Sequence, residues 1–102
     1  MAAVNAVVLI QCEIDEIPEA AEAIAGIDGV TEVYSVAGEY DLVAICRVSD
    51  HDDLARVIPD GIAKVEGVAR TETLIAFQVY SKHDLERMFS IGFEQDEEPI
   101  GP

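Results

Sequence analysis

Apolar residues recur at every second position in four stretches of the chain, a spacing that is typical of β-strands. The four stretches are residues 5–14, 30–37, 42–48 and 68–80. The stretch 42–48 is apolar on both faces, because Val43 and Ile45 point away from the apolar residues that flank them. A strand of this kind has to be covered on both sides, and 102 residues are too few to supply both layers. We therefore expect a second copy of the chain to supply one of them.

The alternation also assigns the side chains of each predicted strand to two faces. In the first stretch, one face comprises Ala6, Val8, Ile10 and Cys12. In the second stretch, Val30, Tyr34 and Val36 share one face and Val33 lies on the other. The second and third strands form a hairpin whose turn falls at Gly38–Glu39, where glycine can adopt the positive φ that such turns often need.

Two segments between the predicted strands show helical spacing. The first covers residues 18–25, has a proline in its first turn, and ends at Gly26 or Gly29. The second begins near Asp50, whose side chain can cap it, and Pro59 predicts a kink or break within it.

The resulting order is β-α-β-β-α-β, and its two halves echo each other. The segment Ile27-Asp28-Gly29-Val30 recurs as Val65-Glu66-Gly67-Val68, each time where a helix leads into a strand. With right-handed crossovers, this order predicts an α+β fold: a ferredoxin-like sandwich with a four-stranded antiparallel sheet, forming a dimeric α/β barrel. We expect this domain to span residues 1–92, including a short closing helix over 82–91, and residues 93–102 to form an acidic flexible tail.

The charge of the chain excludes several partners. It carries 21 acidic and 6 basic residues, for a net charge of −15, and the basic residues are scattered. Nucleic-acid binding depends on clustered Lys and Arg, so we expect no direct contact with DNA or RNA. No apolar run approaches the roughly 20 residues of a membrane span, and the start lacks the basic region of a signal peptide. We therefore expect a cytoplasmic protein without a membrane partner.

Little in the sequence points to catalysis. Cys12 and Cys46 lie in apolar strand patterns without C-x-x-C spacing, so we interpret both as small buried residues. His51 and His83 are interpreted as surface residues. No nucleotide-binding motif, nucleophile elbow or metal-ligand spacing is present, so we expect no cofactor and no metal.

The hairpin turn and the polar start of the last strand remain as the candidate ligand site. Its residues are Gly38, Glu39, Tyr40, Asp41, Thr71 and Thr73. Main-chain N–H groups of the turn can bind a carboxylate, Asp41 can accept hydrogen bonds from an ammonium group, and the threonines add hydroxyls. This set complements an amino-acid zwitterion. The alternative is that Asp41 satisfies the backbone of the turn and that the threonines only decorate a strand.

Two segments resemble the effector-binding (RAM-type) domain of the Lrp/AsnC family of leucine- and asparagine-responsive regulators. They are Gly38-Glu39-Tyr40-Asp41-Leu42, followed by an apolar strand, and residues 65–73. The resemblance runs from Val4 to Tyr80 and implies a βαββαβ domain that dimerises through its sheets and often assembles into rings. It also implies amino-acid or related ligands between subunits, near the hairpin. The ligand contacts of the family transfer to Gly38, Tyr40, Asp41, Thr71 and Thr73.

Family members that regulate transcription carry a helix-turn-helix domain before this one, whereas this chain begins directly at the first strand. We therefore expect an amino-acid sensor without its own DNA-binding domain, acting as a homodimer, as a ring, or with a full-length regulator as partner. Two other functions stay open. One is a small dimeric α/β-barrel enzyme, such as a monooxygenase or isomerase, with only Tyr34 and Tyr80 as candidate residues. The other is a purely structural oligomerisation partner.

Overall fold

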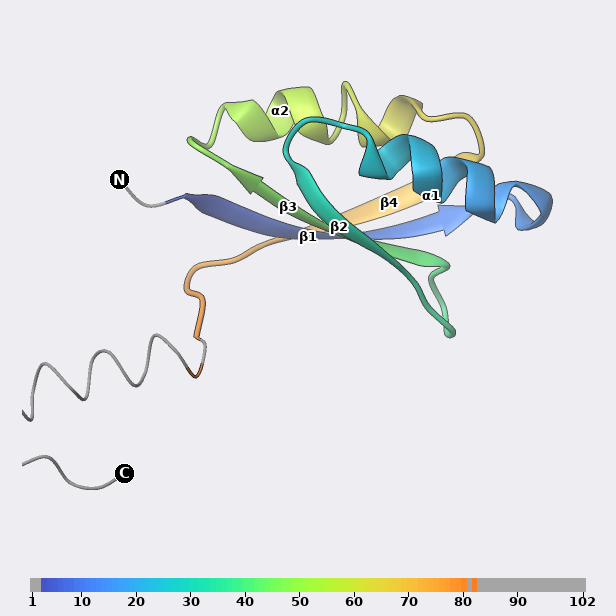
Figure 1. The fold of residues 1–102 in the computed structure, drawn as a ribbon, viewed down its shortest axis with the longest axis horizontal. Coiled ribbons are helices and arrows are strands. Elements are labelled where there is room, and N and C mark those ends of the chain that lie inside the picture. Colours follow the sequence, from blue (N-terminus) through green and yellow to red (C-terminus); the bar gives the residue numbers. More distant parts are fainter. Residues whose placement is uncertain (1–2, 81, 83–102) are drawn as a thin grey trace, which may run out of the picture.

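The computed structural model describes residues 3–80 and residue 82 (Figure 1). Its strands are β1 (Val4–Cys12), β2 (Val30–Ser35), β3 (Leu42–Val48) and β4 (Val68–Ile75). Its helices are α1 (Ile17–Ala25) and α2 (Asp53–Val57), and it has two 3-10 turns, η1 (Ile14–Glu16) and η2 (Ile62–Lys64). Apart from Lys82, the closing helix predicted over 82–91 and the tail predicted over 93–102 lie outside the described residues.

The four strands form one antiparallel sheet in the order β2-β3-β1-β4. Strands β1 and β3 lie side by side at its centre, paired from Val4 opposite Val48 to Ile10 opposite Leu42. Both helices lie on the same face of the sheet, called the inner face here, and the opposite face is the outer face (Figure 1). This arrangement confirms the predicted βαββαβ ferredoxin-like fold.

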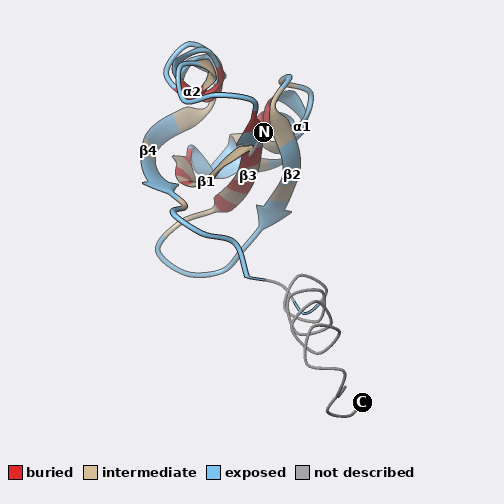
Figure 2. Cartoon of the chain, turned by 90° about the vertical axis from the view of Figure 1, so that its left-hand side faces the viewer, coloured by how far each residue is buried: buried red, intermediate tan, exposed pale blue. Residues whose placement is uncertain are grey.

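The core lies between the inner face and the helices. Its strand residues alternate along β1 and β3 as the pattern predicts: Ala6, Val8, Ile10, Cys12, Leu42, Ala44, Cys46 and Val48. The helices contribute Ala20, Ile24, Leu54 and Val57. Figure 2 shows buried residues along β3 and on the sides of the helices that face the sheet. Both cysteines are buried and free, which confirms that they pack as core residues.

The predicted face assignment within β2 is wrong at Val30. The pairing of β2 with β3 shifts between Val30 and Glu32, and this irregularity lets both Val30 and Val33 pack against the core. Tyr34 lies opposite an outer-face residue of β3 and is 49% exposed. A bulge adds one residue on one strand only. Strict alternation ignores this extra residue and therefore assigns the residues before the bulge to the wrong face. The strand also ends at Ser35, two residues earlier than predicted.

The repeated segments at 27–30 and 65–68 form the same turn. In each, the first carbonyl accepts a hydrogen bond from the fourth N–H, at 3.0 Å in the first copy and 3.1 Å in the second. The third residue has positive φ in both, 103° at Gly29 and 97° at Gly67. These turns end the helical segments and start β2 and β4, so the sequence repeat reflects a structural one.

The last strand, β4, ends at Ile75, whereas the alternating pattern predicts a strand that continues to Tyr80. Among the residues that the structure describes, the last backbone hydrogen bond joins the Ala76 N–H to the Asn5 carbonyl oxygen at 2.9 Å. Because β1 begins one residue before Asn5, the described part of the chain offers no strand beside the residues that follow. Residues 76–80, called the arm below, leave the sheet on its outer side (Figure 1).

Candidate functional site

Tyr40, at the end of the β2–β3 hairpin, is the centre of a hydrogen-bonded cluster. Its phenol donates to Glu72 Oε1 at 2.5 Å and accepts from Arg70 Nη2 at 3.1 Å. The guanidinium carbon of Arg70 lies 5.6 Å from the centre of the Tyr40 ring, within cation–π range. Gln11 Nε2 donates to the main-chain oxygen of Glu39 at 3.0 Å and so ties the hairpin to β1. The cluster therefore presents a cation, a phenol and a carboxylate side by side.

This cluster lies on the outer face, because β4 directs alternate side chains to opposite faces. Arg70 and Glu72 pair with outer-face residues of β1, and both reach Tyr40. Thr71 and Thr73 pair with buried residues of β1 and therefore belong to the inner face. The sheet thus separates the two predicted threonines from Tyr40.

On the inner side, Thr73 lines a groove of about 370 Å³ between α2 and β4. Leu54 and Ile75 give it apolar walls, and His51 and Asp52 add polar groups. The groove exists because the second helical segment is short and broken, so that it covers β3 and leaves β4 partly open.

Asp41 uses its side chain within the fold. Its Oδ2 accepts a hydrogen bond from the Cys12 N–H at 2.8 Å, and its own N–H donates to the Ile10 carbonyl at 2.9 Å. The first bond forms where the pairing of β1 with β4 shifts between Gln11 and Cys12, a place where the regular ladder cannot satisfy the backbone. The second carboxylate oxygen retains its lone pairs for an external donor.

The backbone of the hairpin turn supplies donors. Within the part of the chain that the structure describes, the N–H groups of Gly38, Glu39 and Tyr40 donate no hydrogen bond. Gly38 has a φ of 135°, which residues with a side chain rarely adopt. These three N–H groups are available to an acceptor from outside the chain.

The structure thus brings four of the six predicted site residues together at the hairpin and leaves two on the other face of the sheet. Three residues that the sequence reasoning did not assign join the cluster: Gln11, Arg70 and Glu72. The signal for the last two was present in the alternation of β4, which sets Arg70 and Glu72 on the face opposite Thr71 and Thr73. The alternation of β4 does not indicate that Tyr40, on the β2–β3 hairpin, lies beside these two residues.

A neighbouring carboxylate raises the pKa of each of two outer-face tyrosines. The bond to Glu72 raises the pKa of Tyr40 above its ordinary value, burial adds to the rise, and the nearby Arg70 opposes it. The pKa of Tyr34 is raised in the same way by its hydrogen bond to Glu32. An ordinary phenol already titrates near pH 10, so both tyrosines are hydrogen-bond donors at neutral pH, and the raised pKa extends this to higher pH.

The remainder of the outer face is largely apolar. Its central side chains, half-buried, are Val7, Leu9, Val43 and Ile45. Leu74 on β4 is 49% exposed. No element among the described residues covers this surface, and an apolar face of this kind marks an interaction site.

Over residues 3–80 and residue 82, the acidic, histidine and cysteine side chains form no group of three or more that could hold a metal ion. In the same part of the chain, no helix is long and apolar enough to cross a membrane.

The model of the Lrp/AsnC ligand-binding domain family matches residues 5–85, which include the whole sheet and the Tyr40 cluster. The chain belongs to the Lrp/AsnC family. The predicted resemblance is therefore confirmed, and the domain is a ligand-binding domain of a transcription-regulator family.

Curated relatives of this Lrp/AsnC domain are longer proteins. It is 42% identical over 59 residues to the HTH-type transcriptional regulator PH1916 of Pyrococcus horikoshii, a match that covers 58% of this chain and 39% of that protein. It is 31% identical over 84 residues to the HTH-type transcriptional regulator YugG of Bacillus subtilis, covering 82% of this chain and 49% of the regulator. The chain thus spans about half or less of the length of these relatives.

Solved structures of the family agree with the fold. The crystal structure of TTHA0845 from Thermus thermophilus superposes with a TM-score of 0.73 at 47% identity, covering 78% of this chain and 99% of that one. The structure of AsnC from Escherichia coli superposes with a TM-score of 0.71 at 26% identity, covering 76% of this chain and 53% of that one.

Proposed function

We propose that this domain binds an α-amino acid or a close analogue at the end of the β2–β3 hairpin. The observation that carries the proposal is a juxtaposition at Tyr40. Its phenol is shared by a guanidinium and a carboxylate, and its backbone ends a turn with three N–H groups that donate no hydrogen bond within the described residues. An amino acid presents one carboxylate and one ammonium group. The turn and Arg70 complement the carboxylate, and Glu72 complements the ammonium group, each through charge-assisted hydrogen bonds.

The predicted site residues have different roles in this proposal. Gly38, Glu39 and Tyr40 contact the ligand through main-chain N–H groups and the phenol. Asp41 offers its second carboxylate oxygen to the ammonium group while the first holds β1. The inner-face hydroxyls of Thr71 and Thr73 would reach such a ligand only from a second subunit.

The proposed role is sensing without catalysis. A protonated phenol whose pKa is raised is neither a nucleophile nor a base at neutral pH. Binding at this position instead links the hairpin to β4, two segments far apart in the chain. We propose that this link conveys the presence of the amino acid to a transcription regulator of the family.

We also propose that two copies pack with their outer faces together. No described residue covers the apolar side chains at the centre of that face, and a two-fold arrangement covers both copies at once. Replacing Val43 by aspartate would set a charge in the middle of the interface. Light scattering should then show a dimer for the wild type at micromolar concentration and a monomer for Val43→Asp, and a wild-type monomer would refute the dimer.

The ligand is tested by thermal shift against the twenty amino acids. A ligand at 100 times its Kd stabilises the folded state by about 2.7 kcal/mol, so a specific amino acid stands out from the rest. For that amino acid, Glu72→Gln should weaken binding about 10- to 150-fold, as expected for the loss of a charged hydrogen bond. Thr73→Val, on the other face, is the matched control and should bind normally. No shift with any amino acid, or a larger effect of Thr73→Val, contradicts the proposal.

A further inference from the structure

The groove between α2 and β4 takes no part in the hairpin site, because the sheet lies between the two. Its volume of about 370 Å³ falls in the range of about 300–1,000 Å³ that small-molecule sites occupy. Thr73 and Ile75, which pair with inner-face residues of β1, are both exposed in it, Ile75 to 44%. The inner face is thus open to a ligand at this end of β4.

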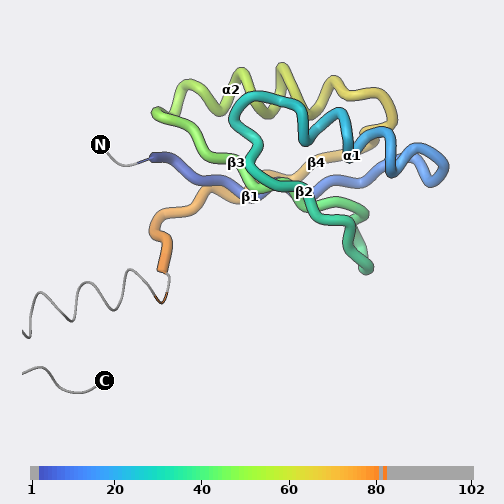
Figure 3. The backbone as a smooth tube through the Cα atoms, viewed as in Figure 1, coloured from blue at the N-terminus to red at the C-terminus, as the bar shows by residue number. Residues whose placement is uncertain are grey.

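The backbone holds this groove open. Helix α2 ends at Val57, and the chain then turns tightly at Gly61, where a Cβ would lie 2.4 Å from the Val57 carbonyl oxygen. The Ala63 N–H donates to the Ile58 carbonyl oxygen at 2.9 Å and ties the turn to the end of the helix. From this turn the chain continues as η2 on the same face of the sheet (Figure 3). The groove is therefore the result of a fixed turn.

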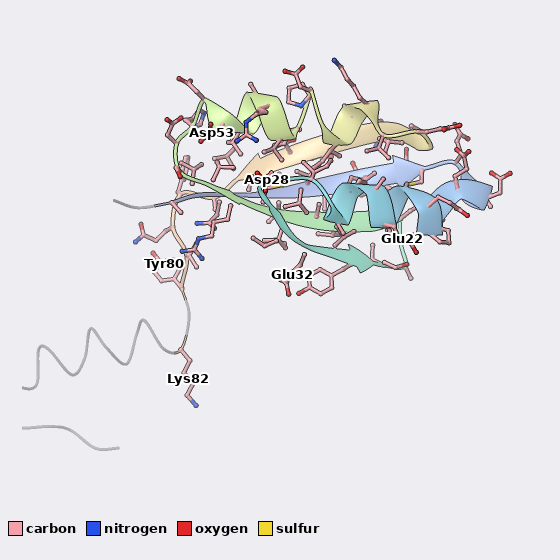
Figure 4. The ribbon with its side chains drawn as sticks, turned by 45° about the horizontal axis from the view of Figure 1, so that its top comes forward. Glu22, Asp28, Glu32, Asp53, Tyr80 and Lys82 are labelled. Carbon is pink, nitrogen blue, oxygen red and sulfur yellow. The ribbon has the colours of Figure 1, made fainter. Side chains whose placement is uncertain are left out.

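The walls of the groove suit an apolar body. Leu54 and Ile58 line it from the helical segment, and Ile75 lines it from β4. Figures 2 and 4 show α2 over the side of the sheet where β4 lies, and α1 over the side of β2. Leu54 is 6% and Ile58 8% exposed, so both are anchored in the core and the walls are preformed. Apolar surface that enters the groove is removed from water, which favours binding.

The polar groups of the groove suit a cation. Asp52 supplies a carboxylate, Thr73 a hydroxyl and His51 an imidazole that accepts a hydrogen bond when it is neutral. Within residues 3–80 and residue 82, none of these three side chains makes a hydrogen bond or an ion pair. The described lining contains no Lys or Arg, and Arg56 of α2 is instead paired with Asp53 at 3.5 Å. A negative charge without a partner therefore adjoins an apolar slot.

We propose that this groove is a second ligand site, which binds a small amine with an apolar or aromatic body and no carboxylate. The body lies between Leu54 and Ile75, and the ammonium group donates charge-assisted hydrogen bonds to Asp52 and a further one to Thr73. A ligand with a carboxylate is disfavoured, because Asp52 repels it and the described lining offers no basic group. The hairpin site, by contrast, complements both charged ends of an amino acid, and the two proposals are independent.

The test is an NMR titration of the ¹⁵N-labelled full chain with three probes that share a phenyl ring: 2-phenylethylamine, phenylalanine and 3-phenylpropanoate. The amine should shift the amides of residues 51–58 and 73–75 and saturate at millimolar concentration, as expected for so small a molecule. At these amides, phenylalanine and 3-phenylpropanoate should bind at least about tenfold more weakly than the amine. Equal binding of 3-phenylpropanoate would overturn the proposal, because it shows that the groove does not select a cation.

Asp52→Asn and the matched control Asp53→Asn test the proposed contact, since each removes one charge from the start of α2. Asp52→Asn should raise the dissociation constant of 2-phenylethylamine about fivefold, which corresponds to about 1 kcal/mol for an exposed ion pair. Asp53→Asn should raise it less than about twofold, because Asp53 pairs with Arg56 and does not line the groove.

Three results would overturn the groove site. One is equal binding of the amine by both variants. Another is amine-induced shifts centred on residues 38–41, which would place the amine at the hairpin. The third is shifts at residues 51–58 that follow protein concentration and not the amine, which would assign the groove to a second copy. Failure of amino-acid binding at the hairpin leaves the groove site standing, and the reverse also holds.

Discussion

Replacing Asp41 by alanine should destabilise the fold, because its carboxylate satisfies the backbone of β1. The Asp41 Oδ2 lies 2.8 Å from the Cys12 nitrogen, at the point where the pairing of β1 with β4 shifts. A hydrogen bond to a charged group contributes about 1.5–3 kcal/mol, and no ladder partner replaces it for the Cys12 N–H. We therefore expect Asp41→Ala to lower the free energy of unfolding by about 1.5–3 kcal/mol.

Urea denaturation at one fixed protein concentration measures this loss, since stability and dimerisation are linked. Glu39→Ala is the matched control: it removes the same charge two residues away, and only the main-chain oxygen of Glu39 makes a hydrogen bond within the described residues. Asp41→Asn should fall between the two, because its amide oxygen can still accept from Cys12 but without the charge. If Asp41→Ala and Glu39→Ala unfold within about 0.5 kcal/mol of each other, Asp41 does not hold β1 in this way.

Three further predictions follow from single contacts. In urea denaturation, Gly29→Ala should destabilise the fold more than Gly38→Ala. Both glycines have positive φ, but a Cβ at Gly29 would lie 2.7 Å from a side-chain carbon of the core residue Val57, whereas a Cβ at Gly38 would meet open space. Equal losses of stability would contradict this. The pKa of Tyr40 should lie above the ordinary value of about 10. The stability that its bond to Glu72 contributes is therefore present below about pH 10 and is lost as pH rises through the raised pKa. An NMR titration in which Glu72→Gln leaves the pKa of Tyr40 unchanged would refute this prediction. Burial, which raises the pKa of Cys46, should keep that thiol unreactive toward a disulfide reagent until the chain unfolds, and rapid native labelling would argue against it.

Local signals in the sequence determine most of this fold. Alternation identifies β1 and β3 because their buried faces carry only apolar residues. The repeated helix-to-strand turn is equally visible, since both copies need glycine at the residue with positive φ. The break in the second helix follows from Pro59, which cannot continue the helical hydrogen bonds.

The features that the sequence could not predict depend on register between strands. The irregularity in the pairing of β2 with β3 adds a residue on β2 only, and the composition of residues 30–33 does not indicate it. Similarly, the end of β4 depends on where its neighbour β1 begins, not on its own apolar pattern, which continues through the arm.

The candidate site shows the same limit. The turn residues were identified because they are contiguous, whereas Arg70 lies 30 residues from Tyr40 in the chain and meets it only through the pairing of β4 with β1. Asp41 and Cys12 are 29 residues apart and are joined by a pairing irregularity. The hydroxyls of Thr71 and Thr73 suggest a role in ligand binding, but the alternation of β4 places both side chains on the inner face.

The most direct test of amino-acid binding at the hairpin is an NMR titration of the ¹⁵N-labelled chain with the amino acid that gives the largest thermal shift. The account predicts that the largest chemical-shift changes occur at the amides of residues 38–41 and at the Arg70 side chain, saturating with a single dissociation constant. Changes centred on the groove between α2 and β4, at Leu54 and Thr73, would contradict it, as would a spectrum that does not respond to the ligand.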